Sequence, residues 1–175
     1  RPLSRGLGDV YKRQAQNDVG FIDEGETLTV TNGANANVSG SYDADEEHSG
    51  DLIDTSSSSH QDSDPDASPT LRISAIQPSG GSSSSVSSGS SYNSSGTSVT
   101  GSYGTLTIGA DGSYTYAAND SISGFDANET LTDTFTYTLS DEHDATDTAT
   151  LTITLLGQDT DCLLYTSPSP RDNGR

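Results

Sequence analysis

Polar and apolar residues alternate between Gly101 and Leu155, which is the period of a β-strand with one buried face. The first alternating pair, 104–108 and 113–116, flanks the turn sequence Gly109-Ala-Asp-Gly112. Two short strands around such a turn predict a β-hairpin.

A second hairpin is predicted from 133–139 and 146–155, which are joined by the polar turn 140–145. Threonines occupy the positions between the apolar residues, so one face of this hairpin is apolar and the other is polar. The expected core face consists of Phe135, Tyr137, Leu139, Ala149, Leu151, Ile153 and Leu155. Sheets buried on one face only are typical of antiparallel sandwiches, so we predict an all-β fold of that kind.

The first half of the chain is less regular. Strands are predicted at 19–23, 27–31 and 70–76. Residues 40–68 are acidic and rich in serine, with Leu52-Ile53 as the one expected core contact. Residues 79–98 are almost entirely glycine, serine and other polar residues, which predicts a flexible Ser/Gly-rich insertion within the domain, because strand patterns continue on both sides.

The two ends of the chain have an unusual relation to each other. Residues 4–14 can be back-translated into a DNA string whose reverse complement, read one base out of frame, encodes 162–171. Two unrelated peptides should not be opposite strands of one DNA. We therefore expect 1–14 and 162–175 to be translated sequencing-adapter DNA, and 15–161 to be a single native domain.

Charge is the most informative part of the composition. The chain has 26 acidic and seven basic residues, and the two ends hold six of the basic residues but only two of the acidic ones. Arg72 is then the one basic residue of the central segment, whose net charge is near −23. Such a charge repels nucleic acid and opposes compaction unless cations neutralise it. It fits either a solvated surface or specific Ca²⁺ binding.

Three stretches, 101–116, 129–141 and 147–153, resemble in sequence and order the VCBS repeat, which belongs with the bacterial cadherin-like repeats of large secreted adhesins. The resemblance implies an antiparallel immunoglobulin/cadherin-like β-sandwich. It also implies arrays of repeats on exported proteins, outside the cell or on the bacterial surface, that mediate adhesion and biofilm formation. Neighbouring repeats of the same polypeptide would be the partners, and Ca²⁺ would stiffen the joints between them.

One group of candidate calcium ligands is Asp62, Asp64 and Asp66, at alternate positions. An EF-hand loop begins with this spacing, but Ala67 stands where that loop needs glycine and Ile73 where it needs glutamate. The stretch resembles instead the Asp-x-Asp motif of cadherin-like repeats. Metal ligands and a solvated loop remain equal interpretations.

The resemblance places further ligands at the joints between repeats. Asn17, Asp18 and Glu24 fall at such positions, and Asp159 would begin the next repeat. Asp141, in the predicted turn of the second hairpin, is another candidate, although an aspartate at a turn more commonly bonds its own backbone.

Signals for catalysis are weak. His48, His60 and His143 lie in polar segments, lack the spacing of a zinc protease, and are interpreted as bystanders. We therefore expect no enzyme, no nucleic-acid partner and no membrane insertion. A carbohydrate-binding module for surface or matrix polysaccharide, using Tyr42, Tyr92 or Tyr103, is the first alternative. An accessory domain of a secreted hydrolase is the second.

Overall fold

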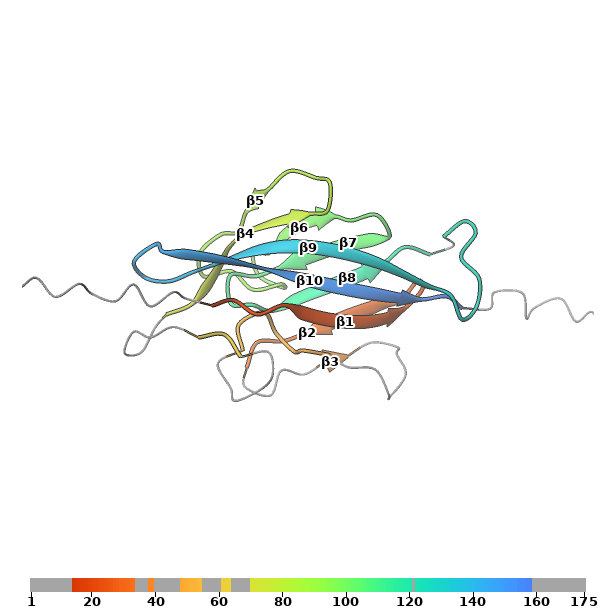
Figure 1. Ribbon diagram of the computed structural model, residues 1–175, viewed down its shortest axis with the longest axis horizontal. Coiled ribbons are helices and arrows are strands. Elements are labelled where there is room, and N and C mark those ends of the chain that lie inside the picture. Colours follow the sequence, from red (N-terminus) through yellow and green to blue (C-terminus); the bar gives the residue numbers. More distant parts are fainter. Residues whose placement is uncertain are drawn as a thin grey trace, which may run out of the picture.

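The computed structural model describes residues 14–33, 38–39, 48–54, 61–63, 70–120 and 122–158. These residues form ten strands in two stacked sheets and no helix, so the predicted all-β sandwich is confirmed (Figure 1). The strands are β1 (Asp18–Asp23), β2 (Thr27–Val30), β3 (Val38–Ser39), β4 (Arg72–Pro78), β5 (Ser84–Ser85), β6 (Thr97–Thr100), β7 (Gly104–Ile108), β8 (Tyr114–Ala118), β9 (Thr130–Ser140) and β10 (Thr146–Leu156).

The first sheet has the strand order β1-β10-β9-β4-β5. β9 and β10 form the predicted second hairpin, an unbroken antiparallel pair over 11 residues of each strand. β1 lies beside β10 and pairs with it in parallel, from Asp18 opposite Leu151 to Asp23 opposite Leu156. The first and last strands of the sandwich are thus joined along the whole length of β1.

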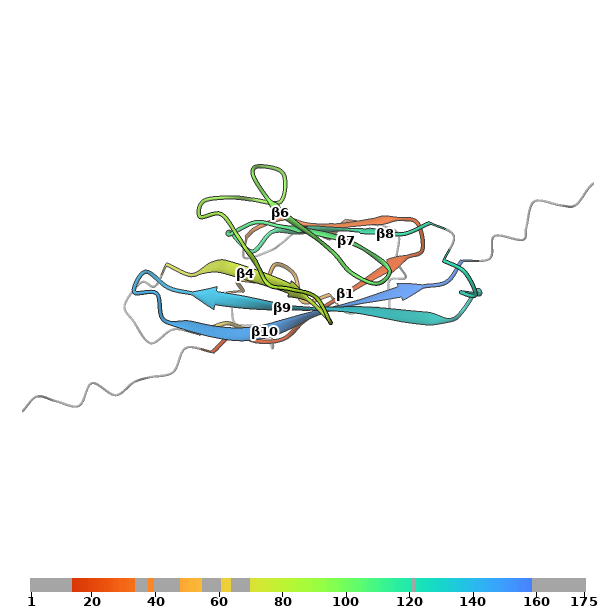
Figure 2. The ribbon, with the colours of Figure 1, turned by 90° about the horizontal axis from the view of Figure 1, so that it is seen from above.

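The second sheet has the strand order β3-β2-β8-β7-β6. It contains the other predicted hairpin, β7–β8, closed by a turn in which Gly112 has a φ of 86°. Figure 2 shows the two layers one above the other. The two hairpins, adjacent in sequence, therefore lie in different sheets and face each other across the core.

Alternate residues of both hairpins fill the space between the sheets, as the pattern predicts. All seven residues expected on the core face of β9 and β10 are buried. The largest side chains with no exposed surface are Tyr114, Tyr116, Tyr137 and Phe135. The tyrosines are amphipathic, so their hydroxyl groups must find polar partners inside the sandwich.

The outer face of β9 and β10 carries threonines. They lie opposite each other in four pairs: Thr132 and Thr154, Thr134 and Thr152, Thr136 and Thr150, and Thr138 and Thr148. Threonine has a high strand propensity and a hydroxyl group for water. The paired threonines give this outer face no charge. The acidic residues of the hairpin lie in the core or near the ends of the two strands.

Residues 79–98 are more structured than their composition predicts. β5 pairs with β4, a bridge joins Ser91 to Ser94, and the hydroxyl group of Ser90 accepts a hydrogen bond from the backbone of Ala110 at 3.0 Å. Val86 is buried and anchors the segment on the core.

The strands lie along the long axis of the molecule, so the sandwich has two poles (Figure 1). We call the end formed by 14–18, 48–54, 61–63 and 141–147 the N-terminal pole. The C-terminal pole is formed by 24–26, 122–129 and 157–158. β1 begins opposite Leu151, beside the middle of β10, and the two strands end together at the C-terminal pole.

Candidate calcium-binding site at the N-terminal pole

Five buried aspartates lie at the N-terminal pole. Asp18, Asp54 and Asp62 are 2%, 9% and 4% exposed, and Asp51 and Asp141 are buried as well. Asp18 points inward because it alternates with Gly20 and Ile22, which are also buried, on the core face of β1. Burial of carboxylates is costly unless they are hydrogen-bonded, protonated or bound to a cation.

Asp62 joins two segments that are distant in sequence. Its Oδ1 accepts a hydrogen bond from the backbone N–H of Gln16 at 2.9 Å, and its Oδ2 accepts one from that of Asp54 at 3.1 Å. The N–H of Asp62 donates in turn to the carbonyl of Asp54 at 2.7 Å. Asp62 therefore holds the residues just before β1 against the 48–54 segment.

Tyr137 reaches the same place from β9. Its hydroxyl oxygen lies 2.6 Å from both the carbonyl oxygen of Gln16 and Oδ2 of Asp18. A tyrosine hydroxyl has one hydrogen to donate, so one of these short contacts requires a proton or a cation from elsewhere. Burial, and then the charge of Asp18, raise the pKa of Tyr137, so the phenol itself stays protonated.

Two carboxyl groups at the pole have raised pKa values. Burial, opposed in part by the N–H of Gln16 and reinforced by Asp18, raises the pKa of Asp62 to about 7. Burial likewise raises the pKa of Asp51 to about 6, although Gly33 donates a hydrogen bond to that carboxylate. These carboxyl groups therefore hold protons at a pH where ordinary aspartates have lost them.

Basic side chains do not neutralise these carboxyl groups in the part of the chain that the structure describes. Arg72 is the one lysine or arginine there, and its guanidinium binds Asp144 at 3.0 Å. Burial lowers the pKa of His48, which keeps that imidazole neutral at pH 7.

Tyr114 adds another oxygen near the pole. Its side chain is fully buried, and its hydroxyl group has no hydrogen-bond partner among the described residues. Burial and the charges of Asp18 and Asp51 raise its pKa. A Cβ at Gly20 would lie 2.9 Å from the side chains of Ile153 and Leu28 and 3.3 Å from this hydroxyl oxygen, so the glycine lets all three side chains approach β1.

The turn between β9 and β10 lies at the same pole. Oδ1 of Asp141, which is 1% exposed, accepts hydrogen bonds from the N–H groups of His143 and Ala145, both at 2.9 Å. Asp141 thus bonds its own turn, as the alternative interpretation expects. Among the described residues, Asp141, Glu142 and His143 are the one group of at least three acidic, histidine or cysteine side chains whose potential ligand atoms all lie within 4.8 Å of one another.

The other predicted ligands are divided between the poles. Asn17 is exposed, and its Oδ1 accepts hydrogen bonds from the N–H and hydroxyl groups of Thr150. Glu24 lies at the C-terminal pole, where its Oε1 accepts one from the N–H of Ile122 at 2.6 Å. Asp18 and Glu24 are six residues apart along β1, a separation of roughly 20 Å, so the two cannot share an ion within one domain. Asp64, Asp66 and Asp159 lie outside the described residues, and their role as ligands stays a prediction.

Sequence reasoning missed Asp54, Asp51 and the two tyrosine hydroxyl groups. Only the apolar pair Leu52-Ile53 indicates a core contact in this acidic stretch. Leu52 is fully buried, and it brings the aspartates on either side of it into the pole. The strand pattern predicts that Tyr114 and Tyr137 are core residues, but it does not predict that their hydroxyl groups lie at the N-terminal pole.

A sequence model of the bacterial cadherin-like domain matches residues 13–157, from the N-terminal pole to the last residues after β10. This chain belongs to the bacterial cadherin-like domain family. The predicted resemblance to bacterial cadherin-like repeats is therefore confirmed. No curated protein matches the chain.

Cadherin-like domains of this family typically occur in surface and adhesion proteins and are generally non-catalytic. In the part of this cadherin-like domain that the structure describes, no helix is long and apolar enough to cross a membrane.

Proposed function

We propose that this domain is a non-catalytic, Ca²⁺-binding structural repeat of an exported bacterial adhesin. In this proposal it works outside the cell or on the cell surface, and its partners are neighbouring repeats of the same polypeptide. Its strongly negative charge argues against nucleic acid as a partner.

The observation that carries the proposal is the gathering of buried carboxylates at the N-terminal pole. Asp18, Asp54 and Asp62 are buried there, and the single hydroxyl hydrogen of Tyr137 faces two acceptors. Calcium takes six to eight oxygen ligands from carboxylates, carbonyls and water, so this donor set fits it in kind. A bound ion would supply the positive charge that protons otherwise provide.

The arrangement of the poles supports a site shared between repeats. The ligand atoms of Asp18, Asp54 and Asp62 do not form a group within 4.8 Å, so one copy offers only part of a coordination shell. Glu24 lies at the opposite pole, where its N–H donates a hydrogen bond to the carbonyl of Leu156 at the end of β10. When copies follow one another along a chain, Glu24 of one copy would face Asp18 and Asp62 of the next. Asp64, Asp66 and Asp159 are the predicted ligands that would complete the shell.

The carbohydrate-binding alternative gains no such support. Sugar rings stack on exposed aromatic faces, but Tyr92 and Tyr103 are both partly buried, and Tyr103 packs against the core. Tyr42 lies outside the described residues. We therefore do not favour polysaccharide binding, and a glycan-binding assay would test it.

Thermal unfolding of the chain tests the calcium proposal directly. The midpoint would be measured in EDTA, in Mg²⁺ and in Ca²⁺ at matched ionic strength. Calcium at 100 times its Kd should add about 2.7 kcal/mol to the free energy of unfolding and raise the midpoint by roughly 5–10 °C. Asp62→Asn should reduce that rise, whereas Asp126→Asn, an exposed acid at the other pole, should leave it unchanged. Equal rises in Ca²⁺, Mg²⁺ and NaCl would mean that the acids form only a screened surface, and the calcium proposal would then be wrong.

A further inference from the structure

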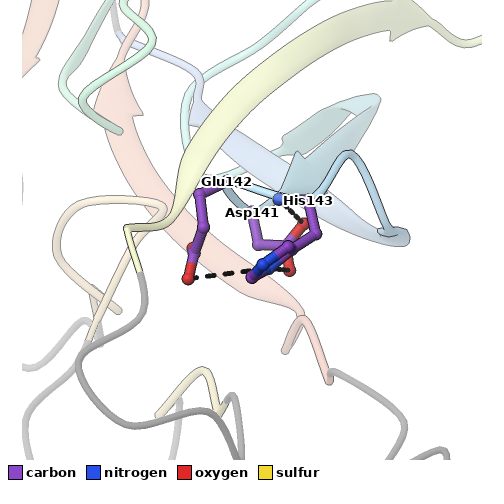
Figure 3. A group of neighbouring side chains, drawn as sticks. All are labelled: Asp141, Glu142 and His143. Carbon is purple, nitrogen blue, oxygen red and sulfur yellow. Dashed lines mark hydrogen bonds and ion pairs between the residues drawn. The ribbon is translucent and has the colours of Figure 1, made fainter.

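Three consecutive side chains in the turn between β9 and β10 point toward one another (Figure 3). The imidazole of His143 lies between two carboxylates. Its Nδ1 is 3.6 Å from Oδ2 of Asp141 and 3.7 Å from Oε1 of Glu142.

These separations exceed a normal hydrogen bond, for which the nitrogen–oxygen distance is about 2.7–3.2 Å. They approach the distance between two ligands of one tetrahedral ion, which is about 3.4 Å for metal–ligand bonds of 2.0–2.1 Å. Potential ligand atoms of all three side chains also lie within 4.8 Å of one another, so the three could converge on one small ion.

Each carboxylate is held by its other oxygen. Oδ1 of Asp141 accepts hydrogen bonds from the backbone of the turn, and Oε2 of Glu142 accepts one from the N–H of Thr70 at 3.0 Å. Oδ2 and Oε1 are thereby directed to the same side as the imidazole. Hydrogen bonds that orient ligands in this way are a regular feature of metal sites in proteins.

The donor set selects a class of ion. Calcium prefers an all-oxygen shell, whereas an imidazole nitrogen suits zinc, copper and nickel. Two carboxylates would balance the charge of a divalent ion, and water could fill the fourth position of a tetrahedral zinc site. We propose that Asp141, Glu142 and His143 form a three-ligand site for zinc or a similar divalent transition metal, separate from the calcium site.

Zinc titration of the full-length chain by calorimetry tests this proposal. It would be done in saturating Ca²⁺ and in a Cys162→Ser background, because a free thiol is itself a zinc ligand. We expect one zinc per chain, with affinity at least tenfold lower in His143→Gln and in Glu142→Gln. Two matched controls, His60→Gln and Asp144→Asn, should change the affinity less than twofold. The imidazole signals of His143 in NMR spectra should shift on zinc addition, while those of His48 stay in place.

Circular dichroism in Ca²⁺ would check that each variant keeps its strands, so that lost binding is not lost folding. Unchanged zinc affinity in His143→Gln would overturn the proposal. So would displacement of zinc by an equal concentration of Ca²⁺, because the turn would then be a general cation surface. Asp62→Asn should leave zinc binding intact, so the zinc and calcium proposals can fail separately.

Discussion

The raised pKa of Asp62 predicts an unusual dependence of stability on pH in the absence of calcium. The pKa of this carboxyl is about 7 in the folded domain, against an ordinary value of 3.8. The preference of the folded domain for the protonated carboxyl therefore contributes its full stability below pH 4, and this stability is lost as the pH rises through 7. A metal-free domain should become less stable from pH 4.5 to pH 8, in contrast to ordinary acid denaturation.

The magnitude follows from the difference between the two pKa values. Each unit corresponds to about 1.4 kcal/mol, so ionisation of Asp62 in the folded state costs at most about 4 kcal/mol. Asp62→Asn removes this titration. It also replaces one of the two carboxylate oxygens by an NH2 group, so either the N–H of Gln16 or that of Asp54 loses its acceptor. The lost hydrogen bond lowers the free energy of unfolding by about 1–3 kcal/mol at every pH. This cost cancels when the stability of the variant at one pH is subtracted from its stability at another.

The assay is urea unfolding of the wild type and of Asp62→Asn in EDTA at several pH values. The wild type should lose about 2–4 kcal/mol more than the variant between pH 4.5 and pH 8. Calcium should abolish the difference, because the bound ion favours the ionised carboxylate. Parallel pH profiles for the two proteins in EDTA would refute the reasoning, since Asp62 would then titrate like an ordinary aspartate.

Two further predictions concern the same pole. Tyr137→Phe removes the hydroxyl group that lies between Gln16 and Asp18. It should lower the free energy of unfolding in EDTA by about 1–3 kcal/mol and also weaken calcium binding. Urea unfolding with and without Ca²⁺ measures both effects. A chain with two copies of residues 15–161 should give a longer maximum dimension by small-angle X-ray scattering in Ca²⁺ than in EDTA, and Glu24→Gln in the first copy should reduce that difference. Identical scattering in both conditions would argue against a shared ion at the joint.

Much of the fold could be predicted from alternation alone. Phe135, Leu151 and the other core-face residues of β9 and β10 are buried as expected, because a strand places every second side chain on one face. The turn at Gly109–Gly112 also follows from local sequence. The structure of 79–98 could not be predicted this way, since its bonds to β4 and to Ala110 depend on partners outside the segment.

The candidate site was predicted less completely than the fold. The family resemblance identifies Asp18 and Asp62 as candidate ligands, but the sequence contains no signal that both are buried near Tyr137. The resemblance also groups Glu24 with Asp18, and the length of β1 separates the two. His143 lies in a polar segment without the spacing of a zinc protease, so its sequence context favours a bystander, and only the folded turn places it beside two carboxylates.

The sequence by itself determined the local properties of this protein: where strands form, which of their faces is apolar, and how strongly negative the chain is. These follow from side-chain period and charge, which need no partner. Only the tertiary structure decided that β1 pairs with β10, that the two hairpins face each other, and that aspartates from three segments meet at one pole. Those features depend on contacts between residues far apart in the chain, and such contacts exist only once the two sheets have packed.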